Sequence, residues 1–359
     1  MSKEISWPQV LAWRLGRQFV SGPPAPDAMT VVRRLCGVQS QVTSSARLAV
    51  AARTGSPGLE APLWEHRSMV KTWLMRGTLH VIPAADLADY CAALSEIRSW
   101  EKGAWQRGHG VSAAEIEAIV RAVPEALGDT PLTREELVEA IFKVTGDEHL
   151  REALTSGWGA LLKPLSRLGE LCYATPRDGK VTFTAPRTWL AGWPSALPAS
   201  AEAGPRLARA FLGAHGPATP EMFGTWLYGV AAKKTMLRSW FTGDDITEIE
   251  VDGARLLTLG EHADSLAETR PSAEVHLLPG FDQYILAAPR SLEPLIPAGV
   301  KPKVSRQAGW ISPVVVYQGR VAGVWEAKPS LTLDLFEDVP KAALATAVDR
   351  MSALLEAAR

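Results

Sequence analysis

The chain has 359 residues, of which 47% are hydrophobic and 21% are charged, and its net charge is −1 at pH 7. This composition is ordinary for a folded globular protein with two or three subdomains, and it excludes a simple polycation that coats nucleic acid. Three cysteines lie far apart, which fits a reducing cytoplasm without a disulfide framework. The chain has neither a Cys-x-x-Cys pair nor an N-terminal signal pattern, so we expect no structural metal, no membrane contact and a location in the cytosol or nucleoid.

Positive charge is concentrated in the first third of the chain. Residues 1–110 hold 13 Lys and Arg against 8 Asp and Glu, a net charge of +5, whereas residues 111–359 have a net charge of −6. A mildly basic first third permits contacts with phosphates without requiring them.

Residues 7–20 predict an amphipathic helix with Pro8 near its first turn, and a Gly- and Pro-rich break follows at residues 21–26. Residues 27–36 predict a second helix, and the apolar residues 46–51 predict a third, more buried one.

The joint between the second and third helices carries two glutamines. Gly37 suits the left-handed position just past a helix end. An extended segment at residues 38–42 would place Gln39 and Gln41 on one face, whereas on a helix they would lie about 200° apart. A solvated turn remains the alternative that the residues alone leave open. The candidate caps of the next helix are Thr43, Ser44 and Ser45.

Residues 70–82 predict two short strands that meet at Arg76-Gly77, with Thr78 and His80 on one face of the second strand. A purely structural role for His80 is the alternative to a role at a site. Residues 86–100 predict a helix, and residues 103–110 predict a flexible Gly-rich loop. The side chains of that loop that could contact DNA, if it is more than a connector, are Trp105, Arg107 and His109.

Residues 111–190 predict three helices and a hairpin. Ser112 with Glu115 and Thr133 with Glu136 form capping-box patterns, a third helix is expected at residues 154–168, and the turn falls at Asp178-Gly179. This order is typical of a winged helix, whose third helix and wing usually contact DNA. The candidate DNA contacts are Thr155, Ser156, Lys163, Arg167, Arg177 and Lys180.

The pattern recurs after a linker at residues 191–205. Residues 127–133 resemble residues 212–219, and a wing is expected at residues 246–259 with its turn at Asp252-Gly253. The expected third helix spans residues 233–241, and its candidate DNA contacts are Lys233, Lys234 and Arg238.

The last third predicts strands at residues 275–278, 283–287, 311–317 and 320–325, and a terminal helix at residues 340–358. Asp282 could serve a site or cap a turn, and the residues leave both open. The basic loop at residues 301–306 offers Lys301, Lys303 and Arg306 as contacts to a DNA backbone.

We therefore predict an α+β fold of tandem winged-helix modules with a C-terminal β-rich, barrel-like subdomain. The predicted segments are an N-terminal winged-helix-like domain (1–110), a winged-helix module (111–190), a linker (191–205), a second winged-helix repeat (206–270) and the β-rich subdomain with its terminal helix (271–359).

Three segments together resemble the AlkZ/YcaQ family of winged-helix DNA glycosylases. They are Gln39-Ser40-Gln41 followed by Ser44 and Ala46, residues 75–83 (Met-Arg-Gly-Thr-Leu-His-Val-Ile-Pro), and residues 277–284 (Leu-Leu-Pro-Gly-Phe-Asp-Gln-Tyr). Gln-x-Gln is the form of the AlkZ branch, which is associated with self-resistance to DNA-alkylating and crosslinking natural products. Its middle residue is usually apolar, whereas here it is Ser40.

The resemblance implies a DNA glycosylase that acts on alkylated purines or crosslinks in double-stranded DNA, with Gln39 and Gln41 as the catalytic pair. It implies no cofactor, and we expect a monomer. The residues that could support the site are Ser44, Arg76, Thr78, His80 and Asp282. A non-enzymatic winged-helix DNA binder or regulator is the competing class, because the same modules would serve it, and an inactive paralogue is a third possibility.

Overall fold

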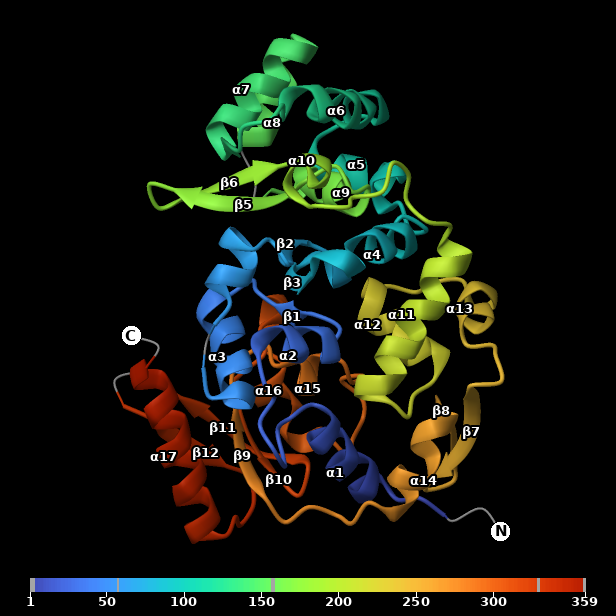
Figure 1. Cartoon of the computed structure of the whole chain (residues 1–359), viewed down its shortest axis with the longest axis vertical. Coiled ribbons are helices and arrows are strands. Elements are labelled where there is room, and N and C mark those ends of the chain that lie inside the picture. Colours follow the sequence, from blue (N-terminus) through green and yellow to red (C-terminus); the bar gives the residue numbers. More distant parts are fainter. Residues whose placement is uncertain (1–3, 57, 156–158, 328–329, 358–359) are drawn as a thin grey trace. The chain divides into compact units, whose positions relative to one another are not determined.

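A computed structural model describes residues 4–56, 58–155, 159–327 and 330–357 (Figure 1). The chain divides into two compact units. Unit 1 combines residues 1–59 with residues 207–359, and unit 2 consists of residues 60–206. Unit 1 is therefore discontinuous in sequence, and the expected domain boundary at residue 110 lies inside unit 2.

Unit 1 begins with α1 (Trp7–Arg17), α2 (Ala28–Arg34), the short strand β1 (Val38–Gln39) and α3 (Thr43–Thr54). The first helix confirms the prediction, because Ser6 and Gln9 form a capping box with Pro8 in the first turn.

The C-terminal part of unit 1 is built on an antiparallel sheet of β9 (Val275–Leu278), β10 (Val314–Tyr317), β11 (Arg320–Glu326) and β12 (Thr332–Leu335). The sheet is open, in the order β12-β11-β10-β9, so the expected barrel-like arrangement was wrong for the described residues. The strands predicted at residues 311–317 and 320–325 are joined by a hairpin turn at Gln318-Gly319, with φ values of 54° and 78°.

Strand alternation gives the sheet two buried faces. Leu277 and Val315 pack with Met351 of α17 (Lys341–Ala357), whereas Leu278 and Val314 face the cluster that includes α1 and α15 (Gln283–Leu286). The strand predicted at residues 283–287 was wrong, because the side chain of Asp282 accepts the backbone N–H of Tyr284 and starts helix α15 instead. A further short helix, α16 (Lys301–Val304), replaces part of the expected basic loop.

Unit 1 also holds the second predicted repeat. Its elements are α11 (Ser200–His215), α12 (Pro220–Tyr228), α13 (Lys234–Trp240), the hairpin of β7 (Ile246–Val251) and β8 (Ala254–Leu259), and α14 (Gly260–Glu268). Three helices followed by a hairpin is the predicted order, and the turn at Asp252-Gly253 is confirmed. Helix α11 begins at Ser200, within the segment expected to be a linker, and the boundary between the units falls inside it.

The first strands of unit 2 form the hairpin of β2 (Met69–Trp73) and β3 (Leu79–Pro83), as predicted. Helix α4 (Leu87–Leu94) ends earlier than the expected helix, and residues 103–110 were wrongly expected to be a loop, because α5 (Gly103–His109) covers most of them. The remaining short turns, from both units, are η1 (Ala61–Glu65), η2 (Met75–Gly77), η3 (Ala84–Asp86), η4 (Ser99–Glu101), η6 (Ala298–Val300) and η7 (Gln307–Gly309).

The rest of unit 2 is α6 (Ala113–Ala126), β4 (Leu132–Thr133), α7 (Arg134–Thr145), α8 (Glu148–Thr155), η5 (Ala160–Leu162), α9 (Lys163–Arg167), β5 (Cys172–Arg177), β6 (Lys180–Thr184) and α10 (Pro186–Trp189). Both capping boxes are confirmed, and the hairpin turns at Asp178-Gly179 as predicted. A single helix at residues 154–168 was wrong, because α8 begins at Glu148 and α9 is a separate, shorter helix. Ser156 and Trp158 lie outside the described residues.

These helices surround a three-stranded sheet in the order β4-β6-β5, over one buried cluster that includes Ile119, Ile141, Leu165 and Phe183. The identification of this unit and of the second repeat as winged helices remains a prediction. Across the described ranges of the whole chain, no helix is both long and apolar enough to span a bilayer. All three cysteines are buried, and none of them is joined in a disulfide.

Candidate active site

Helix α2 ends in a left-handed turn that directs the chain into the glutamine segment. The N–H of Gly37 bonds to the carbonyl of Val32 at 2.9 Å, and the N–H of Cys36 bonds to that of Arg33 at 3.1 Å. This pair of bonds is a Schellman motif. Cys36 takes the left-handed position with φ of 57°, and Gly37 follows with φ of 100°. The expected left-handed glycine is therefore preceded by a left-handed cysteine.

The two glutamines follow at once and differ in burial. Gln39 belongs to β1 and is 5% exposed, Ser40 is 2% exposed, and Gln41 is exposed. The segment is not helical until Thr43, which agrees with the extended joint that a shared site requires. Gln41 is thus the accessible member of the pair, and Gln39 is set into the protein.

The start of α3 differs from the prediction. Its N-cap is Val42, which has no side-chain cap bond, so Thr43, Ser44 and Ser45 form the first turn rather than the cap. Val42 instead packs against the cluster that holds Phe281 and Tyr284. The residue next to Gln41 therefore packs on a core cluster to which the third motif of the sequence, residues 277–284, also contributes.

A buried ion pair fixes the other end of α3 to the same motif. The two terminal guanidinium nitrogens of Arg53, Nη1 and Nη2, donate to the carboxylate of Asp282 at 2.8 Å, and both side chains are 0% exposed. Arg53 also donates to the carbonyls of Gln18 and Ala49 at 2.8 Å. Both oxygens of Asp282 are engaged and one caps α15, so the capping alternative is confirmed.

Arg76, Thr78 and His80 belong to unit 2 and are described within it. Arg76 occupies the hairpin turn with φ of 57°, and the hydroxyl of Thr78 donates to the carbonyl of Met75 at 3.1 Å. His80 is 0% exposed, and its Nδ1 lies 2.9 Å from the carbonyl of Thr78. That ring nitrogen must therefore carry the proton, because a carbonyl only accepts.

The other nitrogen of His80, Nε2, is buried without a hydrogen-bond partner among the described residues. Burial, and secondarily the charge of Arg76, lower the pKa of His80 to about 3. His80 is accordingly a neutral imidazole at physiological pH, with an unused lone pair inside unit 2.

Five of the basic residues predicted to contact DNA are already paired with carboxylates of their own unit. The ion pairs are Arg177 with Glu136, Lys180 with Glu135, Arg238 with Glu221, Lys303 with Asp334 and Arg306 with Glu326. Among the described residues, Lys163, Lys233, Lys234 and Lys301 take part in no ion pair of this kind.

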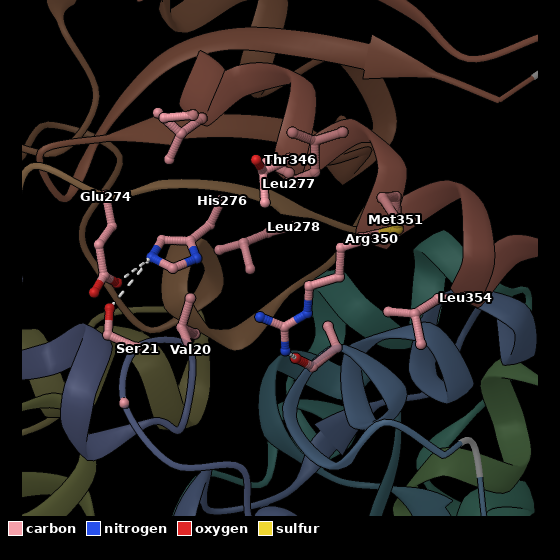
Figure 2. Close-up of a pocket in the computed structure, with 15 residues that line it drawn as sticks. Val20, Ser21, Glu274, His276, Leu277, Leu278, Thr346, Arg350, Met351 and Leu354 are labelled. Carbon is pink, nitrogen blue, oxygen red and sulfur yellow. Dashed lines mark hydrogen bonds and ion pairs between the residues drawn. The ribbon is translucent and has the colours of Figure 1, made fainter. Parts of the chain in front are cut away.

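Unit 1 contains a cavity of about 390 Å³ that the sequence analysis did not anticipate (Figure 2). His276, Glu274 and Ser21 lie at one end, and Arg350 of α17 donates to the carbonyl of Ala52 at 2.7 Å. Nε2 of His276 contacts both Glu274 at 2.9 Å and Ser21 at 3.2 Å. A serine–histidine–acid relay needs the two different ring nitrogens, so this cluster is not a catalytic triad.

This cavity is separate from the glutamine pair. Ala52 lies in the last turn of α3, whereas Gln41 precedes its first turn, which corresponds to about 15 Å along the helix axis. Among the described residues, no group of three His, Cys, Asp or Glu side chains is placed to hold a metal ion.

Sequence reasoning missed Arg53, the partner of Asp282. The available signal was a charged residue near the end of the apolar run at residues 46–51, where a buried arginine requires a buried acid. The acid is 229 residues away, so the pairing could not be read from spacing.

Comparison with known proteins adds three findings. Residues 32–359 match the sequence profile of a family described as "DNA glycosylase AlkZ-like". A protein of Streptomyces sahachiroi named "Interstrand DNA cross-link repair glycosylase" is 43% identical over 327 residues, which cover 90% of this chain and 88% of that protein. The solved structure of S. sahachiroi DNA glycosylase AlkZ superposes with a TM-score of 0.93 at 40% identity, covering 99% of this chain and 98% of that one.

The matched residues include both glutamines, the unit 2 hairpin and the motif around Asp282, so the similarity extends over the segments described above. It also decides against the non-enzymatic alternative. The chain belongs to the AlkZ-like family and is a DNA glycosylase.

Proposed function

We propose that this protein is a monofunctional DNA glycosylase, acting as a monomer on double-stranded DNA, that hydrolyses the N-glycosidic bond of cationic purines alkylated at N7 or N3. The observation that carries the proposal is the Gln39-x-Gln41 segment, which is not helical, has Gln41 exposed and is followed by Val42, which packs on a core cluster.

The chemistry of the leaving group explains why amides suffice. Hydrolysis of a glycosidic bond passes through a transition state that resembles an oxocarbenium ion. A purine alkylated at N7 or N3 already carries positive charge and departs as a neutral base. The enzyme therefore needs little acid catalysis, and uncharged lesions are expected to be poor substrates.

Two tasks remain for the protein, namely to place a water near the anomeric carbon and to offer negative potential to the sugar cation. The amide oxygens of Gln39 and Gln41 are acceptors for both tasks, and they do not titrate at ordinary pH. Gln41, being exposed, is assigned to the water, and the more buried Gln39 is assigned to orienting the pair. No lysine nucleophile enters this route, so we expect no strand cleavage.

We extend the proposed substrates to bulky adducts and interstrand crosslinks. The relative from S. sahachiroi is named for interstrand crosslink repair, and it is 43% identical to this chain. Gln41 is exposed beside a short strand. This position suits a substrate that approaches along an open groove better than a base that is flipped into a closed pocket. Self-resistance to a genotoxic natural product is the corresponding biological role.

The test is release of N7-methylguanine from methylated duplex DNA by the wild type, Gln39→Ala, Gln41→Ala and the double variant. Gln307→Ala, which alters an exposed glutamine in η7, is the matched control. We expect release by the wild type and the control, strong loss in the three site variants, and strand breaks only after alkali.

A wild type that releases no methylated base should next be given duplex DNA crosslinked through purine N7 atoms. Failure on both substrates would overturn the proposal. Strand cleavage without alkali would overturn the monofunctional route alone.

A further inference from the structure

Three helices of unit 1 end close to one buried imidazole. Gln18 is the C-cap of α1, Leu35 is the C-cap of α2, and His215 is the last residue of α11. The exposed fractions of these residues are 1%, 0% and 4%. The last carbonyls of a helix have no partner within it and must find one elsewhere. His215 contacts residues at the ends of both other helices.

The two ring nitrogens of His215 have opposite hydrogen-bonding roles. Nε2 lies 3.1 Å from the carbonyl of Leu35 and must carry the proton, because a carbonyl only accepts. Nδ1 lies 3.0 Å from the amide nitrogen of Gln18, which also donates to the carbonyl of Ala214 at 3.2 Å. The reverse orientation of this amide would place its oxygen against that carbonyl. Nδ1 therefore accepts, and the partners select the neutral ring with its proton on Nε2.

The carbonyl that His215 binds belongs to the turn that leads into the glutamine segment. Leu35 is followed by the left-handed residues Cys36 and Gly37, and Gln39 is four residues from Leu35. The N–H groups of Leu35, Cys36 and Gly37 all bond to carbonyls of α2. Helix α2 therefore holds the N–H side of the turn, and His215 holds the carbonyl of Leu35. The direction in which the chain leaves α2 depends on both contacts.

The backbone that follows His215 is itself attached to α1. Nε of Arg14 donates to the carbonyl of Gly216 at 3.2 Å, and Nη2 donates to the carbonyl of Pro217 at 2.9 Å. Arg14 is 6% exposed, so water does not compete freely for these two bonds. Hydrogen bonds from a charged donor are stronger than those between neutral groups. The imidazole is thus mounted on a segment that α1 holds in place.

We propose that His215 is a positioning residue for the glutamine pair, because its bond to the carbonyl of Leu35 sets the direction of the segment that carries Gln39 and Gln41. This inference rests on the proposed function in taking the two amides as the catalytic groups. Amide oxygens that place a water act through their geometry. A displacement of about 1 Å can lower the rate of an enzyme about 100-fold.

Two substitutions separate the roles of the ring nitrogens. The amide of glutamine reaches the place of Nε2, so His215→Gln can still donate to the carbonyl of Leu35 while its contact with Gln18 is lost. The amide of asparagine reaches only the place of Nδ1, so His215→Asn keeps an acceptor for Gln18 and loses the bond to Leu35. His215→Phe keeps a ring and loses both bonds. We call His215→Asn and His215→Phe the loss variants.

The first test is single-turnover release of N7-methylguanine from methylated duplex DNA, with a thermal melt of each variant. We expect a loss of about 10- to 100-fold in the loss variants and of less than about 3-fold in His215→Gln. His276→Asn is the control and should keep the wild-type rate, because that ring contacts Glu274 and Ser21 instead. Equal losses in all three His215 variants, or losses that follow their melting temperatures, would overturn the proposal.

The Gln41→Ala background tests whether His215 acts through the glutamines. The losses from His215→Asn and Gln41→Ala should not multiply, because a segment without its catalytic amide gains little from being held in place. Losses that multiply fully would show that His215 acts by another route.

A further readout does not depend on activity. The side-chain amide signal of Gln39, assigned in ¹⁵N spectra with Gln39→Ala, should shift in the loss variants and stay in place in His215→Gln. An unshifted signal in both loss variants would mean that the segment does not depend on the imidazole, which contradicts the proposal.

Failure of this inference can be told apart from failure of the proposed function. Glutamine variants that lose activity while the loss variants stay fully active would remove only His215 from the mechanism. A wild type that releases no base, or glutamine variants as active as the wild type, would remove the proposed chemistry. The Gln39 signal would then still report whether His215 sets the segment.

Discussion

Arg53 and Asp282 form a bidentate ion pair with both N–O distances at 2.8 Å, and neither side chain is exposed to solvent. The pair joins the last part of α3 to the N-cap of α15, and α3 begins two residues after Gln41. The candidate active site is therefore supported by a charged pair inside the core of unit 1.

Removal of one partner should destabilise unit 1 strongly. Asp282→Asn leaves the guanidinium of Arg53 buried without its countercharge, and we expect a loss of about 3–5 kcal/mol in the free energy of unfolding. Urea unfolding measures this change. Replacement of both partners, Arg53→Met with Asp282→Leu, should recover part of the loss, because no buried charge is left unpaired. A single variant as stable as the wild type would contradict the buried pairing.

Alanine substitutions of the two glutamines should differ in their effects on stability and on activity. Gln41 is exposed, so Gln41→Ala should change the free energy of unfolding by less than about 0.5 kcal/mol. We expect its base-release rate to fall by about 100-fold, the size of effect that removal of one electrostatic group produces in other enzymes. Gln39→Ala removes a buried side chain and should lower both the free energy of unfolding and the base-release rate. Single-turnover assays and thermal melts of the same preparations test this contrast, and an active Gln41→Ala would be the opposing result.

His80 should make the free energy of unfolding depend on pH in the acidic range. Its pKa is about 3 in the folded protein, against 6.5 for an unperturbed histidine. Below pH 6.5 the unfolded chain binds one proton more than the folded chain, so stability falls as the pH drops from 6.5 towards 3 and is unaffected above 6.5. The slope from this residue is about 1.4 kcal/mol per pH unit within that window.

The measurement is the urea unfolding free energy at a series of pH values for the wild type and for His80→Asn. Asparagine retains a donor for the carbonyl of Thr78 and does not titrate. The difference between the two proteins isolates His80 from the carboxylates that titrate in the same range. Parallel pH profiles would show that His80 is not buried as a neutral ring.

Arg177 and Lys180, the two paired cations of the β5–β6 hairpin, should strengthen DNA binding when they are released from their ion pairs. Glu135→Gln with Glu136→Gln frees Lys180 and Arg177 from their partners. Glutamine at position 136 still accepts from the backbone N–H of Thr133, so the capping box of α7 is kept. We expect tighter binding to duplex DNA at low salt that disappears at high salt. Unchanged affinity at low salt would mean that the β5–β6 hairpin stays farther from DNA than the Debye length.

Local signals in the sequence predicted local structure well. The Ser112–Glu115 and Thr133–Glu136 boxes start α6 and α7, and Asp178-Gly179 and Asp252-Gly253 turn their hairpins. Each of these features depends on residues within four positions of one another. The glutamine joint was also predictable as a non-helical segment, because a helix ends before it and another begins after it.

Predictions failed where distant residues decide the outcome. Residues 283–287 are rich in β-forming side chains, yet the cap from Asp282 makes them helical, and Asp282 is itself oriented by Arg53. The cap of α3 was assigned to hydroxyl residues, whereas the packing of Val42 on a core cluster sets where the helix starts. The ion pairs of Arg177 and Lys180 likewise could not be predicted from the sequence, since they join residues of the β5–β6 hairpin to acids on α7.

The discontinuity of unit 1 has a consequence for synthesis on the ribosome. Arg53 emerges 229 residues before its partner Asp282, a delay of roughly 10–50 s at a translation rate of about 5–20 residues per second. Residues 60–206, which form unit 2, are complete within that interval. The nascent chain therefore finishes one core while the first 59 residues of the other still lack most of the side chains that will bury them.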